Sequence, residues 1–150
     1  MLDTQDYLEV CWKALVRDDV IDHNKYNQTI LVLGADPEHT IRFLRRYGYG
    51  NVASMVYDDA HKHITQLPFP EQSVDTIVVQ YVPGITNAAD RKQFVDECKR
   101  IARGGCMLML DLQTAGIPAD HKGLKIQAEF IEQFDWTVLD NRKARCLLRQ

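Results

Sequence analysis

The sequence predicts an α/β fold, with a doubly wound and mostly parallel sheet that ends in an antiparallel hairpin. Short apolar runs alternate along the chain with longer segments of helical periodicity, an order typical of parallel strands joined by crossover helices. The runs are almost continuously apolar, as strands buried on both faces are. A length of 150 residues suits one domain. We therefore predict a single domain over residues 1–150, with an N-terminal helix and connector at 1–27 and a core at 28–150.

The N-terminal segment predicts an amphipathic helix over residues 4–17. Its apolar side chains recur at the i, i+3, i+4 and i+7 spacing that places them on one helical face, namely Leu8, Cys11, Trp12 and Leu15. The next apolar run, residues 29–34, is rich in β-branched residues and stops at a glycine. This composition predicts the first buried strand.

A helix is expected directly after that strand. Asp36 precedes Pro37, and an acceptor side chain followed by proline fits the cap and first turn of a helix. We expect this helix to end at Gly48 or Gly50, because glycine often follows the last helical residue. The remaining patterns predict strands at 51–57, 74–82 and 104–112, helices at 88–102 and 122–134, and a closing antiparallel pair at 136–139 and 145–148.

Composition and charge exclude several classes of protein. The balance of 18 Lys and Arg against 21 Asp and Glu gives a net charge of −3. A net negative charge does not favour nonspecific binding to the phosphates of a nucleic acid. No apolar run is long enough to span a bilayer, and the N-terminus is acidic where a secretory signal would be basic. The four cysteines lack zinc or CxxC spacing, so we interpret them as buried hydrophobes. The sequence predicts a soluble cytoplasmic protein with no metal, membrane or nucleic-acid site.

The strand exits are the places to look for a ligand, because open α/β sheets bind ligands beyond the carboxyl ends of their strands. The residues at these exits are Gly34, Ala35, Asp36, Asp58, Asp59, Gln80, Tyr81 and Asp111. Asp58 follows Gly34 by 24 positions, close to the roughly 20-residue offset at which a carboxylate binds a ribose. This spacing predicts a nucleoside-containing ligand. The simpler interpretation is that Asp58 and Asp59 are turn residues after a strand.

Two landmarks in the middle of the chain point to a family. A loop Leu-Pro-Phe-Pro at 67–70 precedes a strand that starts Ser-Val-Asp at 73–75, and the next helix ends in Lys-Arg-Ile-Ala-Arg-Gly-Gly at 99–105. From about residue 28 to its end the chain resembles the class I S-adenosylmethionine-dependent methyltransferases. The resemblance implies a Rossmann-like sheet and S-adenosylmethionine as cofactor. It places around the cofactor the residues Gly34, Ala35, Asp36, Asp58, Asp59, Gln80 and Tyr81.

The glycine loop departs from that family. In members of that family the first strand typically ends in an acid, a hydrophobe and then Gly-x-Gly-x-Gly. The glycines of this pattern let the backbone approach the ligand. Here Val32 stands in place of the acid, and Asp36 and Glu38 stand in place of the second and third glycines. We expect these two side chains to narrow the cofactor cleft.

A strand and helix unit of the family is missing between Asp58 and Leu67, where few residues remain. The strand ending at Tyr57 then serves either as the family's second strand, with Asp58 on the ribose, or as its third, with Asp59 beside the adenine. Losing a strand also exposes a sheet edge. A neighbouring chain or the N-terminal helix would cover this edge.

Two functions stay open. The first is a methyltransferase acting on a small molecule, for which alignment and exclusion of water matter more than an acid or base. No catalytic residue is therefore assigned, and the candidates have simpler interpretations as packing, turn or loop residues: Gln80, Tyr81, Asp111, His61 and His63. The second is a catalytically inactive subunit, a pseudoenzyme that keeps the fold and binds a protein partner.

Overall fold

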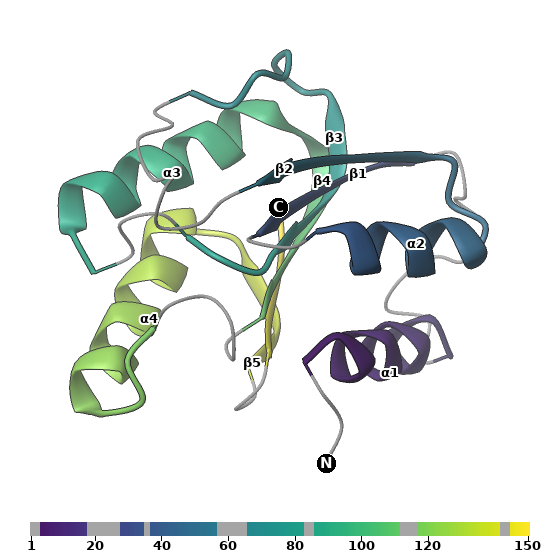
Figure 1. Ribbon diagram of the computed structural model, residues 1–150. Helices are drawn as coiled ribbons and strands as arrows, with labels where there is room; N and C mark the ends of the chain where they lie inside the picture. The colour runs from purple at the N-terminus through teal and green to yellow at the C-terminus, as the bar shows by residue number, and fades with distance from the viewer. Residues whose placement is uncertain are drawn as a thin grey trace.

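Six strands form one sheet, with helices packed on both of its faces (Figure 1). The computed structural model describes residues 4–17, 28–34, 37–56, 66–82, 86–111, 117–141 and 145–150. Its elements are α1 (Thr4–Arg17), β1 (Thr29–Gly34), α2 (Glu38–Arg46), β2 (Asn51–Val56), β3 (Val74–Val79), α3 (Ala88–Ile101), β4 (Ala102–Asp111), α4 (His121–Phe134), β5 (Thr137–Asn141) and β6 (Arg145–Arg149).

The strand order in the sheet is β2-β1-β3-β4-β6-β5. The first four strands in this order are mutually parallel. β6 runs antiparallel to both of its neighbours, β4 and β5. The predicted fold class, a doubly wound and mostly parallel sheet with an antiparallel end, is therefore confirmed.

The two faces of the sheet carry separate hydrophobic clusters. On the side of α3 and α4, alternate strand residues such as Leu33 and Leu108 pack with Phe130. On the side of α1 and α2, the other strand residues pack with a fully buried Trp12, whose ring makes edge contacts with Phe43 and Tyr49. Because both faces are covered, the central strands have no polar face, which explains their continuous apolar runs.

Most element positions agree with the predictions, and the differences lie at their ends. α2 begins at Glu38 with Pro37 as its cap residue and no side-chain cap. It ends at Arg46 with Tyr47 as its C-cap, and Gly48 follows with a φ of +107°, so the prediction that a glycine ends this helix is confirmed at Gly48. β3 ends at Val79, short of the predicted 82, so Gln80 and Tyr81 follow the strand. The side chains of Leu8 and Cys11, predicted to face the core, lie outside the described part of the chain.

β4 begins two residues earlier than predicted, at Ala102, opposite Val74. The pairing then becomes irregular before Thr76 meets Met107. Gly105 lies in this irregular stretch with a φ of +80°, a conformation that side chains other than glycine rarely adopt. The Gly-Gly turn of the sequence landmark therefore shapes the start of this strand.

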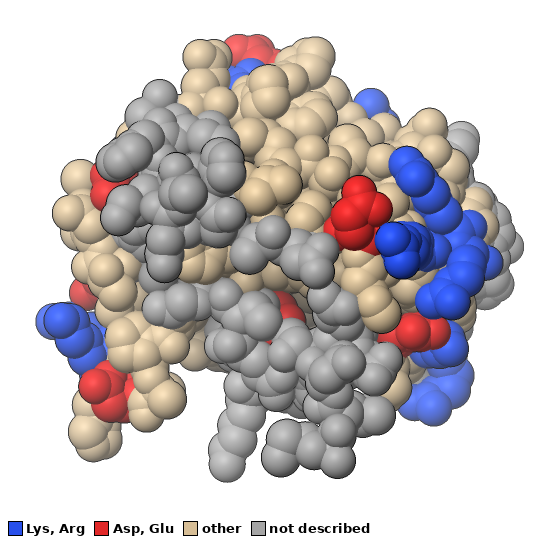
Figure 2. Space-filling view, in the orientation of Figure 1, with Lys and Arg blue, Asp and Glu red and all other residues tan. Residues whose placement is uncertain are grey.

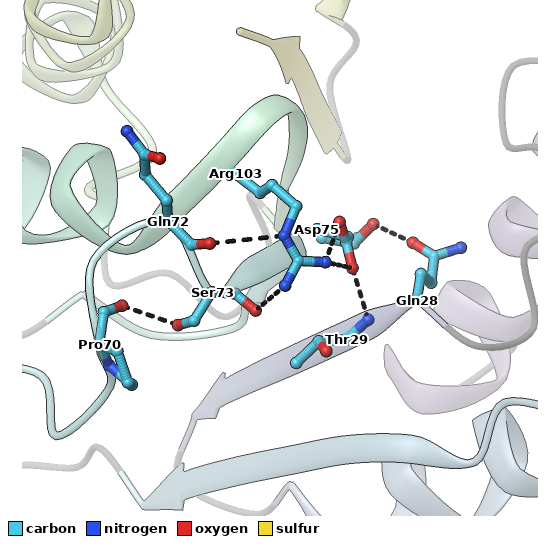
Figure 3. A network of polar contacts seen from close by, with 8 residues as sticks. Gln28, Thr29, Pro70, Gln72, Ser73, Asp75 and Arg103 are labelled. Carbon is cyan, nitrogen blue, oxygen red and sulfur yellow. Dashed lines mark hydrogen bonds and ion pairs between the residues drawn. The ribbon is translucent and has the colours of Figure 1, made fainter.

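A polar network ties together the amino ends of β1, β3 and β4 (Figure 3). The Asp75 carboxylate accepts hydrogen bonds from the Thr29 backbone N–H at 2.8 Å and from Arg103 Nη1 at 2.9 and 3.0 Å. Arg103 also donates to the carbonyls of Gln72 and Ser73. Asp75 and Arg103 belong to the two sequence landmarks. These landmarks therefore stabilise the sheet at the amino ends of its strands, away from the carboxyl ends where a ligand is expected.

The Leu-Pro-Phe loop is held to α3 by a second network. Arg100 donates to the carbonyls of Leu67 at 2.8 Å and Phe69 at 2.9 Å, and its Nε pairs with Glu97 at 2.7 Å. Glu97 in turn accepts from the Leu67 N–H at 2.7 Å. This landmark is likewise explained by structural contacts.

Candidate functional site

The strand order reverses direction between β1 and β3. From β1 the chain passes to β2 on one side, and it returns to β3 on the other side of β1. In open α/β sheets the crevice beyond such a switch point is the usual place for a ligand. The described residues at this carboxyl edge are Gly34, Gln80 and Tyr81, with Asp111 at the end of the next strand, β4. The structure thus brings together three of the predicted cofactor residues.

Gln80 bridges three elements at this edge. Its backbone N–H donates to the Leu33 carbonyl at 2.7 Å, which extends the pairing of β1 and β3. Its side-chain Nε2 donates to Thr40 Oγ1 of α2 at 2.9 Å. Gln80 is only 7% exposed and Thr40 is almost fully buried, so this hydrogen bond is shielded from water. An amide left without a partner there would lower the free energy of unfolding.

Gly34 is the strand residue against which Gln80 packs. A Cβ placed on Gly34 would lie 2.9 Å from both the Cβ and the Oε1 of Gln80, closer than van der Waals contact allows. The absence of a side chain at Gly34 therefore has an explanation inside the protein. This glycine, the one that the loop shares with the family pattern, makes room for Gln80.

Tyr81 and Asp111 are less accessible than rim residues would be. Tyr81 is partly buried and packs against the cluster on the side of α3 and α4, in line with its simpler interpretation. Asp111 is 3% exposed at the end of β4 and pairs in register with Arg145 of β6. Asp111 is therefore a buried carboxylate and not an exposed turn residue. The sequence alone does not show that the end of β4 is buried.

The departures in the glycine loop can be compared with the structure at two positions. Val32, which stands in place of the family's acid, is fully buried and packs with the cluster on the side of α1 and α2. Glu38 begins α2 and is exposed in its first turn, where a negative charge is favourable toward the helix dipole. The position of the family's third glycine is thus the first residue of α2.

Several predicted site residues lie outside the described part of the chain: Ala35, Asp36, Asp58, Asp59, His61 and His63. The ribose and adenine assignments of the two acids at 58 and 59 stay predictions. Thr40, by contrast, was not predicted as part of the site. Its only sequence signal is a polar residue on the inner face of an otherwise apolar helix stripe.

Charge is unevenly spread over the surface. Figure 2 shows Lys and Arg side chains gathered at one side of the molecule, over α1 and α2. The exposed arginines of α2 are Arg42, Arg45 and Arg46. Arg45 and Arg46 lie in the last turn of the helix, where positive charge is favourable toward the dipole, and α2 begins, with Glu38, just after the end of β1. The basic group therefore lies away from the switch point.

The cysteines that the structure describes are inert core residues. Burial raises the pKa of Cys106 and of Cys146 to about 12 and raises that of Cys98 well above its ordinary value of 9.0. Such thiols stay protonated near neutral pH. Among the described residues no group of three His, Cys, Asp or Glu could hold a metal ion. None of the described helices has the length and apolar character needed to cross a membrane.

A family match accompanies this geometry. Residues 26–110 match a family described as a methyltransferase domain. The match spans more than half of the chain, from just before β1 to the end of β4. The chain belongs to this methyltransferase domain family.

Solved structures share its fold. An S-adenosylmethionine-dependent methyltransferase from Archaeoglobus fulgidus aligns over 95% of this chain and 94% of its own, with 8% identity and a TM-score of 0.56. One from Mesorhizobium loti aligns over 93% and 97%, with 10% identity and a TM-score of 0.55. One from Aquifex aeolicus covers 99% and 98%, with 13% identity and a TM-score of 0.50. No curated protein sequence matches the chain.

Proposed function

We propose that the chain is an S-adenosylmethionine-dependent methyltransferase that binds its cofactor beyond the carboxyl ends of β1 and β3 and methylates a small molecule. The observation that carries the proposal is the switch point between these strands, combined with membership of the methyltransferase domain family. The predicted ribose acid, Asp58, lies two positions after the end of β2 in the sequence. All three features favour a nucleoside-containing ligand at one edge of the sheet.

The described residues fit the cofactor in part. The strand order supplies the position, and the backbone at the end of β1 carries Gly34. Two features fit less well, because Val32 provides no acid and the space beside Gly34 is filled by Gln80. The cofactor would then be held by the backbone at 34–36 and by the acid at 58 or 59, with Gln80 packed against Gly34.

The cofactor supplies an activated methyl group when bound. The role of the protein is to align the acceptor with that methyl group and to exclude water from the site. Gln80 contributes by fixing the start of α2 to the end of β3 through Thr40. Tyr81, the partly exposed polar residue that follows Gln80 at this edge, is our candidate for contact with the acceptor.

A second candidate function is a catalytically inactive methyltransferase-fold subunit that binds a protein partner. The packing of Gly34 against Gln80 favours it, because the glycine that usually admits a ligand is explained by an internal contact. The buried Val32 favours it as well. In either function we expect a cytoplasmic protein that does not bind nucleic acid.

The experiment that separates the two functions is a binding measurement with S-adenosylmethionine and S-adenosylhomocysteine. For the methyltransferase we expect saturable heat in calorimetry at micromolar concentrations. At about 100 times the dissociation constant we also expect about 2.7 kcal/mol of stabilisation against unfolding. No heat and no stabilisation would leave the inactive subunit. Adenosine and methionine together, as separate molecules, are the control for nonspecific effects.

Asp58→Asn and Asp59→Asn are the matched variants for the cofactor site. The two positions are adjacent and carry the same side chain, so loss of a charge is equal in both. If the strand β2 serves as the family's second strand, only Asp58→Asn weakens binding, by about tenfold or more for a lost charged hydrogen bond. Equal effects of the two changes would contradict a specific ribose ligand.

A further inference from the structure

β2 is the outer strand of the described sheet on the side of β1. It pairs in regular parallel register with β1 from Asn51 to Val56, without a bulge. No described strand lies on its other side. Asn51, Ser54 and Val56 are exposed, and the large apolar side chain of Val56 is 44% exposed. An outer strand of this kind presents backbone N–H and C=O groups that can pair with another strand.

The opposite edge of the same sheet is protected. β5 pairs with β6 through a register irregularity between Val138 and Asp140, and it ends in Asp140 and Asn141. Bulges and charged residues are the features by which proteins prevent unwanted pairing at sheet edges. β2 has neither a bulge nor a charge nor a proline. The two edges of one sheet therefore differ in the features that prevent strand addition.

We propose that two copies of this chain associate through their β2 strands, which pair antiparallel across a twofold axis between Ser54 of one copy and Ser54 of the other. This arrangement places Val52 opposite Val56 and Ala53 opposite Met55 of the second copy, so that opposite side chains lie on the same face of the sheet. The two sheets become one continuous sheet across the axis. Closed twofold pairing of identical surfaces is the commonest form of association among soluble proteins.

The composition of β2 favours a second copy over a different partner. In antiparallel self-pairing each strand meets its own sequence reversed, so a charge near the middle of β2 would lie beside its own symmetry mate. The strand Asn-Val-Ala-Ser-Met-Val has no charged residue, so self-pairing brings no like charges together within the strands. A basic or acidic peptide partner would find no complementary charge there.

Sedimentation of the full chain at increasing concentration tests the proposal. The runs need about 0.3 M salt, because the exposed arginines of α2 repel between copies and salt shortens the range of that repulsion below about 8 Å. We expect the mass to rise from one chain to two, with a dissociation constant of about 1–100 µM, as for a modest interface. A mass of one chain up to about 500 µM would overturn the proposal.

Ser54→Lys is the variant that blocks the edge. Ser54 is exposed and meets its own symmetry mate at the axis. Lysine there leaves the core intact, brings two like charges together and is expected to weaken association at least tenfold. The matched control is Leu139→Lys on β5, which is 38% exposed and should leave the dimer unchanged. A dimer that persists in Ser54→Lys, or one lost equally in both variants, would contradict pairing through β2.

Hydrogen exchange of the unaltered chain keeps the test independent of any variant. Amides of residues 51–56 should exchange more slowly at high than at low protein concentration, because pairing protects them. Those of 137–141 should exchange at the same rate in both samples. Concentration-independent exchange at β2 in a sample that contains dimer would refute this interface.

Discussion

The amide of Gln80 and the hydroxyl of Thr40 join the end of β3 to the first turns of α2 through a buried hydrogen bond of 2.9 Å. The stem of the same glutamine fills the space that a side chain on Gly34 would need. One residue after β3 thus supports both the end of β1 and the start of the helix that follows it. The elements on either side of the expected cofactor site are therefore joined by this contact.

Gly34→Ala should destabilise the protein by about 1–3 kcal/mol, the usual cost of overpacking a buried site. The cost arises because the new Cβ would lie 2.9 Å from two atoms of Gln80. Urea unfolding measures it. Gly50→Ala is the matched control, since a Cβ there meets nothing within 4 Å, and it should change stability by less than about 1 kcal/mol.

The same substitution can be tested in a second background. With Gln80→Gly the contacting atoms are gone, so Gly34→Ala should cost less there than in the natural chain, and the difference is the coupling free energy of the pair. An unchanged cost would mean that Gly34 is needed for another reason, such as the approach of a ligand.

Asp75→Ala should cost about 1–3 kcal/mol of unfolding free energy, because it leaves the Thr29 N–H and Arg103 without their shared acceptor. Arg103→Ala should cost less, at most about 1 kcal/mol, since this arginine is half exposed and such pairs are screened by water. Thermal or urea unfolding of both single variants and the double variant measures the pair. A larger effect of the arginine would contradict this order.

Glu97 should make stability depend on pH in the acidic range. Its hydrogen bond from Arg100 is the main reason that its pKa lies below the ordinary 4.5. A lowered pKa in the folded state means that the carboxylate stabilises the fold above about pH 4.5, and that this contribution disappears as the pH falls through the lowered value. The difference in unfolding free energy between the natural chain and Glu97→Gln should therefore shrink below that pH.

Urea unfolding at a series of pH values checks this prediction. Asp96→Asn is the control, because Asp96 pairs with Lys92 at the surface, where both side chains are more than half exposed. Such pairs contribute little, so its difference from the natural chain should stay small at every pH. A difference for Glu97→Gln that grows as the solution is acidified would contradict the assigned direction.

Restoring glycine at both Asp36 and Glu38 should strengthen S-adenosylmethionine binding by about tenfold, or about 1.4 kcal/mol. The reason is that glycine allows the backbone to approach a ligand, whereas side chains hold it away. Calorimetry measures the affinity. Glu38→Gln is the control, because it removes the charge and keeps the size at an exposed position. If this control accounts for the whole gain, charge and not size limits binding.

Local patterns predicted the elements well, for identifiable reasons. Residues 29–34 and 74–79 are buried on both faces, so their apolar runs are continuous and easily read as strands. The start of β4 was misplaced, because Ala102 already pairs with Val74 before the irregular stretch around Gly105, and the prediction placed the start after Arg103. The cap predicted at Asp36 lies outside the described residues, and Pro37 serves as the cap residue of α2 without a side-chain hydrogen bond, because proline has no side-chain acceptor.

The sequence by itself determined the strands, the helices and the family landmarks, because these depend on periodicity and on residues close together in the chain. Only the tertiary structure decided what Gly34, Gln80 and Thr40 do, since they meet only when β1, β3 and α2 pack side by side. It also decided which edges of the sheet are outermost. Strand order depends on how the faces of all six strands are buried together, which no local pattern contains.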